Sequence, residues 1–502
     1  MAKLMIVNFL LSLILGLLTN CTKPDYEIIE KKPYMGGQYY VATWGDDENP
    51  GTFKEPFASL QKAMNVSQPG DTTYIRGGVY HITTSQSINP DRRHSTAVSG
   101  TRENPVHYYN YPGEKPIFDA SGNEGLFPAG IHMNNVQYIK FRGITVRNVF
   151  QNTIHRDPAE LANGWAMSRS ANLTFENCVA HDINGRGWFG GSGAWNEWDG
   201  PDASWDYDTT IWINCDAYNL HDPLSATPGN GADGWKVHGY QGNVFIWEGC
   251  RAWNYSDDGF DASGSAYKYF YNCWAMATDK YRYLEDAEGN GFKCASLNPS
   301  YYFPEHLDDT ILVKYVNCLA VFNPRVGFYN NIVNGSRKQN NAFYFNNLAY
   351  ANGVGIACWS GRSEGRPHWN TSKFRNNISW GSTQAEQGFD PIYEVQIFRV
   401  LYDHNDMNTW KPTGRWPGWK YNDDFALEDA AFTSLDSLTI IREMTAPRKP
   451  DGSLPDITWA RLVPNSDMKG AGENVGMSAT PDLGVDWDFF ERMQGYTFFD
   501  FP

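Results

Sequence analysis

The chain has 502 residues, of which 20% are charged, 15% are aromatic and 47 are glycine, and its formal net charge is −16. This composition predicts an ordered, turn-rich protein and argues against disorder. The acidic balance argues against nucleic acid as a partner, because phosphate binding needs a basic surface. An acidic protein can still bind an acidic polymer locally where a divalent cation bridges the two.

The first residues predict export. An apolar run over 4–18 is short for a transmembrane helix and typical of a signal peptide. Residues 18–21 read Leu-Thr-Asn-Cys, which resembles a bacterial lipobox and makes Cys21 the expected site of lipidation. We therefore predict a signal peptide over 1–21, a tether over 22–35 and an exported bacterial lipoprotein at the cell surface, the outer membrane or in the periplasm. An ordinary secretory signal, and hence a secreted protein, is the alternative.

The mature sequence opens with a strand pattern over 39–42 and an amphipathic helical pattern over 56–65. A solenoid needs a cap over its open first turn, and a short helix with one apolar face supplies one. Asn-Pro-Gly-Thr at 49–52 and Pro-Gly-Asp-Thr at 69–72 flank this helix. The whole opening resembles the entry of right-handed parallel β-helix polysaccharide lyases.

A repeated Asn-Cys-x-Ala unit gives the strongest structural signal. It begins at Asn177, Asn214, Asn272 and Asn317, and variants of it begin at Gly249, Asn346 and Asn376. The period drifts between 23 and 45 residues, which suits coils that carry loops of unequal length. We therefore predict an all-β fold, a right-handed parallel β-helix solenoid, as a single catalytic domain over 36–502. A helix is expected to cap its N-terminal end, and a C-terminal segment from about Arg461 is expected to wrap back along it.

Five of the eight cysteines occupy one position of this repeat: Cys178, Cys215, Cys250, Cys273 and Cys318. In stacked coils their Cβ atoms would lie about 4.8 Å apart, beyond the roughly 3.5–4.5 Å of a disulfide. We therefore predict a buried ladder of thiols. A zinc site is disfavoured because the sequence has no Cys-x-x-Cys spacing. The neighbouring asparagines are expected to form a second, hydrogen-bonded ladder.

Three short segments can be superposed on one another. Residues 232–236 read Ala-Asp-Gly-Trp-Lys, residues 257–261 read Asp-Asp-Gly-Phe-Asp, and residues 289–293 read Gly-Asn-Gly-Phe-Lys. Their glycines are 25 and then 32 residues apart, which suits successive turns of a solenoid. Stacking would form two columns of side chains on one face: Asp233, Asp258 and Asn290 in one, and Lys236, Asp261 and Lys293 in the other.

The columns gather four carboxylates beside two lysines: Asp233, Asp257, Asp258 and Asp261 with Lys236 and Lys293. Such a cluster is costly unless a cation lies in it, and carboxylate oxygens suit calcium better than zinc or copper. The alternative is a solvated loop face or a set of Asx turns, which single aspartates beside glycine usually form. The shared register of the four favours the calcium site.

A lysine beside calcium is a candidate base, because the cation disfavours the ammonium form. The matching substrate is a sugar acid whose C5 hydrogen lies next to a carboxylate. Removing that proton creates a charge that a cation can stabilise, and loss of the C4 oxygen then gives an unsaturated uronide. The pattern therefore predicts β-elimination, with Lys236 and Lys293 as near-equal candidates for the base.

At these residues the chain resembles polysaccharide lyase family 9, whose members are calcium-dependent pectate and rhamnogalacturonan lyases. The resemblance implies Ca²⁺ as cofactor and Lys293 as the catalytic base, and it covers nearly the whole mature chain. It implies an acidic pectic polysaccharide as partner, either homogalacturonan or rhamnogalacturonan I. We expect a monomer that meets a membrane only through its lipid anchor. The residues that the resemblance assigns to the metal are Asp233, Asp257, Asp258 and Asp261.

Three further cations are candidates for binding substrate. Lys236 lies one coil before Asp261, and a salt bridge to the calcium ligands is the preferred interpretation for it. Arg282 lies in the insertion just before the base, and Arg325 lies on the next coil. Either arginine is suited to a substrate carboxylate, and a surface role is the alternative for both.

Two other classes of function remain open. A pectin hydrolase on the same fold would use a pair of carboxylates as acid and base, and Asp257 with Asp258 is the candidate pair. A non-catalytic glycan-binding β-helix would keep the acidic cluster without needing Lys293. The chemistry of the product separates the three.

Overall fold

The computed structural model describes most of residues 36–502. The described residues are 36–88, 99–154, 161–191, 209–239, 243–264, 266–277, 287–296, 313–332, 342–360, 373–381, 396–398, 401–402 and 428–492. The chain divides into two compact units, 1–35 and 36–502, and every described residue belongs to the second. The predicted signal peptide, tether and lipidation site at Cys21 lie outside the described residues, as does Arg282. Within the described part, no helix is both long and apolar enough to span a bilayer.

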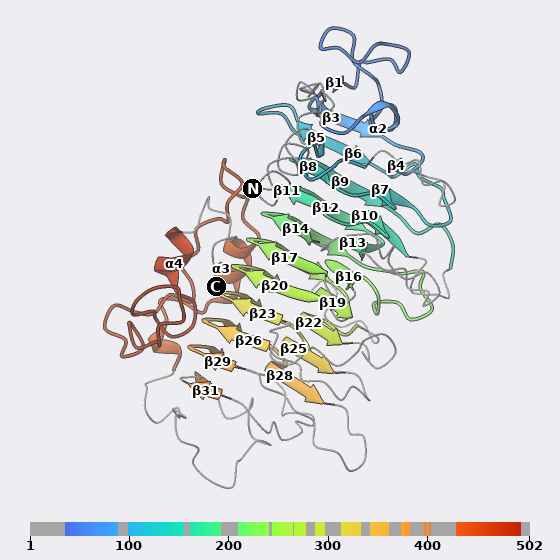
Figure 1. Ribbon diagram of the computed structural model, residues 1–502. Helices are drawn as coiled ribbons and strands as arrows, with labels where there is room; N and C mark the ends of the chain where they lie inside the picture. The colour runs from blue at the N-terminus through green and yellow to red at the C-terminus, as the bar shows by residue number, and fades with distance from the viewer. Residues whose placement is uncertain are drawn as a thin grey trace, which may run out of the picture. The chain divides into compact units, whose positions relative to one another are not determined.

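Strands of three parallel sheets make up most of the described structure (Figure 1). Sheet A contains β1 (Gln38–Val41), β2 (Thr72–Ile75), β5 (Val106–Asn110), β8 (Ile139–Arg142), β11 (Thr174–Glu176), β14 (Thr209–Ile213), β17 (Val244–Glu248), β20 (Tyr267–Tyr271), β23 (Val313–Val316), β26 (Ala342–Phe345), β29 (Lys373–Arg375) and β31 (Gln396–Phe398). Sheet B contains β3 (Gly78–His81), β6 (Pro116–Asp119), β9 (Thr145–Val149), β12 (Val179–Ile183), β15 (Asp216–Leu220), β18 (Arg251–Tyr255), β21 (Trp274–Met276), β24 (Leu319–Val321), β27 (Leu348–Tyr350), β30 (Ile378–Trp380) and β32 (Leu401–Tyr402). Sheet C contains β4 (Gln86–Ile88), β7 (Ala129–Asn134), β10 (Ala162–Ser168), β13 (Gly185–Gly191), β16 (Trp235–Gly239), β19 (Asp258–Gly264), β22 (Asn290–Ser296), β25 (Val326–Ile332) and β28 (Val354–Ser360).

The order of the strands shows how the chain coils. Along most of the chain, consecutive strands fall in different sheets, and each strand pairs in parallel with the strand one coil earlier and one coil later. This stacking confirms the predicted parallel solenoid. Because each coil repeats the same three strands, a residue pattern that recurs once per coil becomes a column of side chains.

The Asn-Cys-x-Ala repeat forms the corner between sheets A and B. The asparagines Asn214, Asn272 and Asn317 have φ values of 52°, 51° and 59°, a left-handed conformation that asparagine tolerates better than most residues. The Asn317 amide donates to Asn272 Oδ1 at 2.9 Å, as the predicted asparagine ladder requires. The adjacent thiols are buried and unpaired: Cys178, Cys215, Cys250, Cys273 and Cys318. Both ladders are therefore confirmed.

Stacked aromatic rings form the core behind sheet C. Trp235 stacks on Phe260 with ring centroids 4.6 Å apart, and Phe260 stacks on Phe292 at 4.8 Å. Trp165 belongs to the same core and is fully buried, like Trp235. Parallel stacking at this spacing adds to the burial of large apolar area and favours one register between coils. This register positions the outward-facing residues of β16, β19 and β22.

Helix α2 (Leu60–Val66) lies at the start of the solenoid (Figure 1). Its residues Leu60, Ala63 and Met64 are buried in the main core. The Gln61 side chain accepts from Ser87 N at 2.7 Å and donates to Ser87 O at 2.8 Å. Since β4 is the outermost strand of sheet C, these bonds satisfy backbone groups that no further strand pairs with.

The C-terminal segment packs against sheet B. It contains the 3₁₀ turn η4 (Asp429–Ala431), α3 (Ser437–Met444) and α4 (Trp487–Arg492). Its apolar residues, from Ala431 to Phe490, form a second core with Trp274, Leu319 and Ile378 of sheet B. This packing begins at Ala431 in η4, earlier in the chain than the predicted start near Arg461. The buried residues Ile440 and Met444 of α3 also belong to it.

Candidate active site

Strand register brings the predicted columns together on sheet C. Lys236 is the register partner of Asp261, and Asp261 is the partner of Lys293. In the other column Asp258 is the register partner of Asn290, and Gly234 N donates to Asp258 O at 2.9 Å, which places Asp233 one coil earlier. Both predicted columns are therefore confirmed.

The glycine of each segment is required by close contact between coils. A Cβ atom on Gly234 would lie 2.3 Å from Gly259 O, and one on Gly259 would lie 2.6 Å from Gly291 O. No side chain fits at these distances, so only glycine allows the coils to stack here. The residues just before these glycines, Asp233, Asp258 and Asn290, are thereby held against one another in successive coils.

The carboxylates fall into two groups that share Asp258. One carboxylate oxygen of each of Asp233, Asp258 and Asp261 lies within 4.8 Å of the others, and the same holds for Asp257, Asp258 and Glu288. The four predicted ligands are therefore close together, although Asp257 groups with Glu288 instead of with Asp233. All four aspartates are buried, with exposed fractions of 3% or less.

Several of these buried oxygens have no hydrogen-bond partner. Among the described residues none forms a hydrogen bond with either carboxylate oxygen of Asp233, or with Oδ1 of Asp257 or Asp261. Leaving buried carboxylate oxygens without partners is costly. A hard divalent cation such as Ca²⁺ takes six to eight oxygen ligands, and the unpaired oxygens are of that type. The donor set therefore fits the expected metal.

Burial is the largest influence on the pKa values of the buried aspartates. It raises the pKa of Asp233 to about 8 and raises that of Asp257 well above its usual value. Burial acts on Asp261 in the same direction, but Lys236 and Lys293 outweigh it and lower the pKa of that carboxyl. Asp261 is thus the aspartate whose charge is best compensated by the chain itself.

The two lysines pair with different carboxylates. The Lys236 ammonium donates to Asp261 Oδ2 and lies 4.0 Å from Asp233 Oδ2, as the preferred salt-bridge interpretation of Lys236 expects. Lys293 Nζ lies 2.9 Å from Asp258 Oδ2 and 3.8 Å from Asp261 Oδ2. Burial disfavours its charge, but these carboxylates outweigh burial and raise the pKa of Lys293 well above the usual value. A neutral Lys293 therefore requires another cation to take up the carboxylates.

Two charged residues of the site were missed in the sequence. Glu288 lies beside the predicted base, with Oε2 3.0 Å from Lys293 Nζ, and its Oε1 lies 3.2 Å from Nη1 of Arg325. Arg186 is fully buried, and its Nε lies 3.6 Å from Asp233 Oδ2. Arg186 was detectable, because Arg-Gly-Trp at 186–188 repeats the polar, glycine, aromatic order one coil before Asp233.

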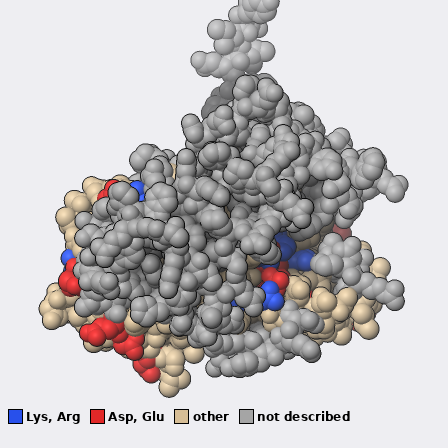
Figure 2. Space-filling view, turned by 90° about the horizontal axis from the view of Figure 1, so that it is seen from below, with Lys and Arg blue, Asp and Glu red and all other residues tan. Residues whose placement is uncertain are grey.

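Charged side chains of both signs meet on the face that Figure 2 shows, where basic and acidic atoms lie directly beside one another.

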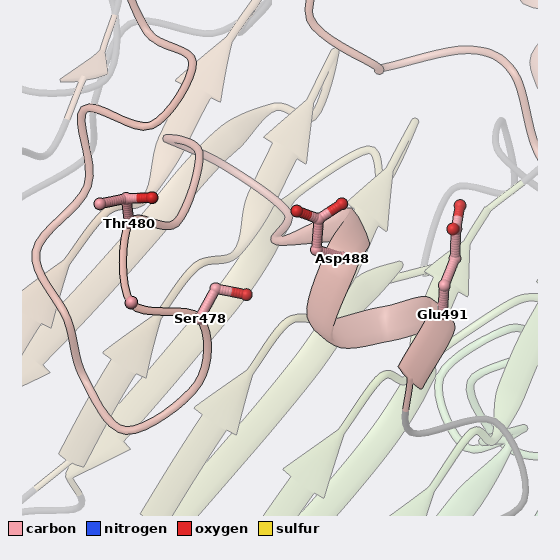
Figure 3. A pocket seen from close by; sticks show the side chains of 5 residues that line it. Ser478, Thr480, Asp488 and Glu491 are labelled. Carbon is pink, nitrogen blue, oxygen red and sulfur yellow. The ribbon is translucent and has the colours of Figure 1, made fainter.

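A cavity of 570 Å³ lies in the C-terminal segment, and none of the predicted site residues lines it. Figure 3 shows Asp488 and Glu491 on α4, and Ser478 and Thr480 on the loop before it. Because the charged groups in its lining are acidic, this cavity does not suit an acidic polymer.

The sequence matches the family described as Pel9A-like, right-handed β-helix region, over residues 39–390. The chain belongs to this family. It is 28% identical over 474 residues to pectate lyase L of Dickeya chrysanthemi, covering 90% of each chain. It is 23% identical over 420 residues to pectate lyase PEL9 of Emericella nidulans, covering 76% of this chain and 92% of that one. Family membership and these relatives place the chain among the polysaccharide lyases.

Two solved structures share the fold of this chain. The crystal structure of pectate lyase Pel9A matches with a TM-score of 0.61 and 26% identity, over 89% of this chain and 95% of that one. A structure of a rhamnogalacturonan lyase matches with a TM-score of 0.56 and 21% identity, over 86% and 97% of the two chains. These matches support the right-handed β-helix predicted from the sequence.

Proposed function

We propose that this polysaccharide lyase cleaves a galacturonate-containing pectic backbone by β-elimination, with Ca²⁺ as cofactor and Lys293 as base. One observation carries the proposal: the Lys293 ammonium contacts Asp258 and Asp261 within a buried acidic group. In that group both oxygens of Asp233, and Oδ1 of Asp257 and of Asp261, form no hydrogen bond with any described residue. The family relationship to pectate lyases supports it.

Asp233, Asp258 and Asp261 would hold the metal, with Asp257 beside them through the shared Asp258. When bound, Ca²⁺ supplies electrostatic stabilisation to the charge that develops on the substrate carboxylate. Arg186 keeps a permanent positive charge next to Asp233 and limits the charge that the buried group accumulates.

Three side chains carry out proton transfer, substrate binding and positioning of a metal ligand. Lys293 Nζ takes the C5 proton of the uronate, the C4–O4 bond breaks, and a C4–C5 double bond forms. The departing O4 gains a proton from solvent, and Lys293 later returns its proton to solvent. Arg325, with a side chain that is 56% exposed, would bind a substrate carboxylate. Lys236 stays paired with Asp261 and fixes that ligand.

Homogalacturonan is the first candidate substrate, because the relatives over most of the chain are named as pectate lyases. Rhamnogalacturonan I is the second candidate, since it also presents galacturonate next to a cleavable C4 oxygen. We further propose that the protein is an exported, lipid-anchored monomer, that α2 caps its solenoid, and that the C-terminal segment covers one side of it.

The test is ultraviolet absorbance of the new double bond. Purified protein is mixed with polygalacturonate, and separately with rhamnogalacturonan I, with calcium or with chelator. We expect a calcium-dependent rise with one polymer that Lys293→Ala lowers by about 10²–10⁴-fold, the usual contribution of a positioned base.

Other results would redirect the proposal. Release of reducing ends without any rise in absorbance would indicate hydrolysis. Retention of full activity by Lys293→Ala would remove Lys293 from the role of base. Binding of the polymer without cleavage would indicate a glycan-binding protein.

A further inference from the structure

We infer that Glu288 is a positioning residue that holds the base Lys293 with one carboxylate oxygen and the substrate-binding Arg325 with the other. The inference rests on the proposed function, because it assigns Glu288 a part in the same reaction. It makes Glu288 the residue that sets the spacing between the group that takes the proton and the group that binds the substrate.

The contacts of Glu288 point in two directions. Its Oε2 lies 3.0 Å from Lys293 Nζ, and its Oε1 lies 3.2 Å from Arg325 Nη1. The exposed fractions of the side chains rise along this chain of contacts, from 15% for Lys293 to 25% for Glu288 and 56% for Arg325. Glu288 therefore connects the partly buried base Lys293 to the guanidinium of Arg325, which faces solvent where a polymer can reach it.

Glu288 differs from the other close partner of Lys293. Asp258 Oδ2 is 2.9 Å from Nζ, but Asp258 belongs to both acidic groups and is the carboxylate they share. A bound cation would engage Asp258, whereas Glu288 lies outside the group formed by Asp233, Asp258 and Asp261. Glu288 is thus the partner that continues to hold Lys293 Nζ when Asp258 serves the metal.

The backbone keeps the two turns that carry Glu288 and Arg325 together. Arg325 N donates to Gly289 O at 3.4 Å, and Val326 N donates to Asn290 Oδ1 at 3.2 Å. Gly289 has a φ of 67°, and a Cβ atom there would lie 2.3 Å from the Pro324 ring. The turn after Glu288 is therefore packed directly on the turn before Arg325, so the bridge between them joins fixed positions.

A role as a metal ligand is the competing explanation, because Glu288 also groups with Asp257 and Asp258. The two roles differ in what they require. A ligand changes the affinity for calcium, whereas a positioning residue changes turnover and substrate binding at saturating calcium. The experiment therefore measures both.

The experiment compares wild type, Glu288→Gln, Arg325→Met and the double variant in the full-length protein. Initial rates at saturating calcium give kcat and KM, titration calorimetry with calcium alone gives the metal affinity, and thermal unfolding checks the fold. Glu114→Gln is the matched control, because Glu114 pairs with Arg76 on the first coils and its side chain is 29% exposed, close to the 25% of Glu288.

We expect Glu288→Gln to lower kcat by about 10- to 100-fold, as loss of a hydrogen bond to a charged group does. Its calcium affinity and Tm should match those of wild type, and Glu114→Gln should keep the wild-type kcat. Arg325→Met should raise KM by about fivefold with kcat unchanged, and by less in the Glu288→Gln background, because the two residues are coupled.

Three results would overturn the inference. The first is a kcat for Glu288→Gln that equals that of active wild type. The second is a KM for the double variant that equals the product of the fold-changes of the two single variants. The third is a calcium affinity weakened by tenfold or more with kcat restored at high calcium, which would make Glu288 a ligand. Absence of unsaturated product from wild type would instead reject β-elimination itself, so the two failures are distinguishable.

Discussion

Two buried charged clusters in this solenoid differ in how their carboxylates are paired. In the first, both oxygens of Asp216 accept from arginine: Oδ2 lies 2.7 Å from Arg251 Nη2, and Oδ1 lies 2.6 Å from Arg448 Nη2. In the second, neither oxygen of Asp233 has a hydrogen-bond partner in the described part of the chain. The backbone around both is the same kind of parallel coil.

The pKa values of Asp233 and Asp216 shift in opposite directions because their carboxylates are paired differently. Burial raises the pKa of Asp233 to about 8. The same burial acts on Asp216, but Arg251 and Arg448 outweigh it and lower the pKa of that carboxyl. The Asp216 cluster is therefore complete within the protein, whereas the Asp233 cluster is suited to a charge that the protein does not supply.

The Asp216 cluster also joins distant parts of the chain. Arg251 Nη1 donates to Met444 O and Ala446 O, and Arg448 Nη2 donates to Gly249 O. The C-terminal segment is thereby fixed to β18 and its neighbours. The fully paired Asp216 cluster therefore stabilises the fold. The incompletely paired Asp233 cluster on sheet C has oxygens that can bind a ligand.

The largest expected effect comes from breaking the paired cluster. Asp216→Ala leaves two buried arginines without their carboxylate, so we expect the free energy of unfolding to fall by about 3–5 kcal/mol in urea titrations. Asp456→Ala removes an exposed partner of Lys449 and should change it by less than about 1 kcal/mol. A similar small change for Asp216→Ala would mean that the two clusters do not differ.

The second effect comes from completing the unpaired cluster. Calcium that binds only the folded protein should stabilise it by about 2.7 kcal/mol at a concentration 100 times Kd. Thermal unfolding with calcium and with chelator measures this shift in Tm. Asp233→Asn should reduce the shift, because it removes a charged ligand, while Asp456→Asn should leave it unchanged. Equal shifts for wild type and Asp233→Asn would remove Asp233 from the metal site.

The smallest effect concerns a paired cluster nearer the surface. Burial disfavours the ionised form of Asp119, but bonds from Ser121, Arg147 and Asn148 outweigh it and lower its pKa to about 2. Because the unfolded value is about 3.9, the bonded carboxylate stabilises the fold above about pH 4, and this stabilisation is lost as pH falls toward 2. Asp119→Asn should cost about 1 kcal/mol at neutral pH.

Urea titrations across this pH range check the sign. The gap between wild type and Asp119→Asn should shrink as the pH falls from about 4 to 2, because wild type then loses the same charge. A gap that stays constant or widens on acidification would show that the Asp119 carboxylate contributes nothing as an ion.

Much of the site was predictable from spacing alone. The columns containing Asp258 and Asp261 follow from three superposed segments, because parallel coils place equivalent residues at a fixed distance. Glu288 was not predicted, since it precedes the superposed segment and reaches Lys293 only through the turn at Gly289. Arg186 was not predicted, since it lies one coil before the first of the three superposed segments.

Four further residues have roles that were predicted from the sequence: Lys293, Arg325, Arg282 and Cys21. The roles of Lys293 as base and of Arg325 in substrate binding are proposals with a defined test. Arg282 and Cys21 lie outside the described residues, so their predicted roles stand as made from the sequence. Lys236 is paired with Asp261, which is the interpretation that the sequence favoured.

Residues that repeat along the sequence account for the coiled architecture, the corner asparagines, the thiol ladder and the row of acids on sheet C. Each of these recurs once per coil, and backbone hydrogen bonds convert such a recurrence directly into a column. The pairing of charges, in contrast, depends on which parts of the chain meet in the folded protein. Asp216 acquires its arginines from β18 and from the C-terminal segment, and Glu288 acquires Lys293 and Arg325 from two different coils. Except for Glu288 with Lys293, these pairs join residues far apart in the chain at distances of about 3 Å, and no local pattern encodes those distances.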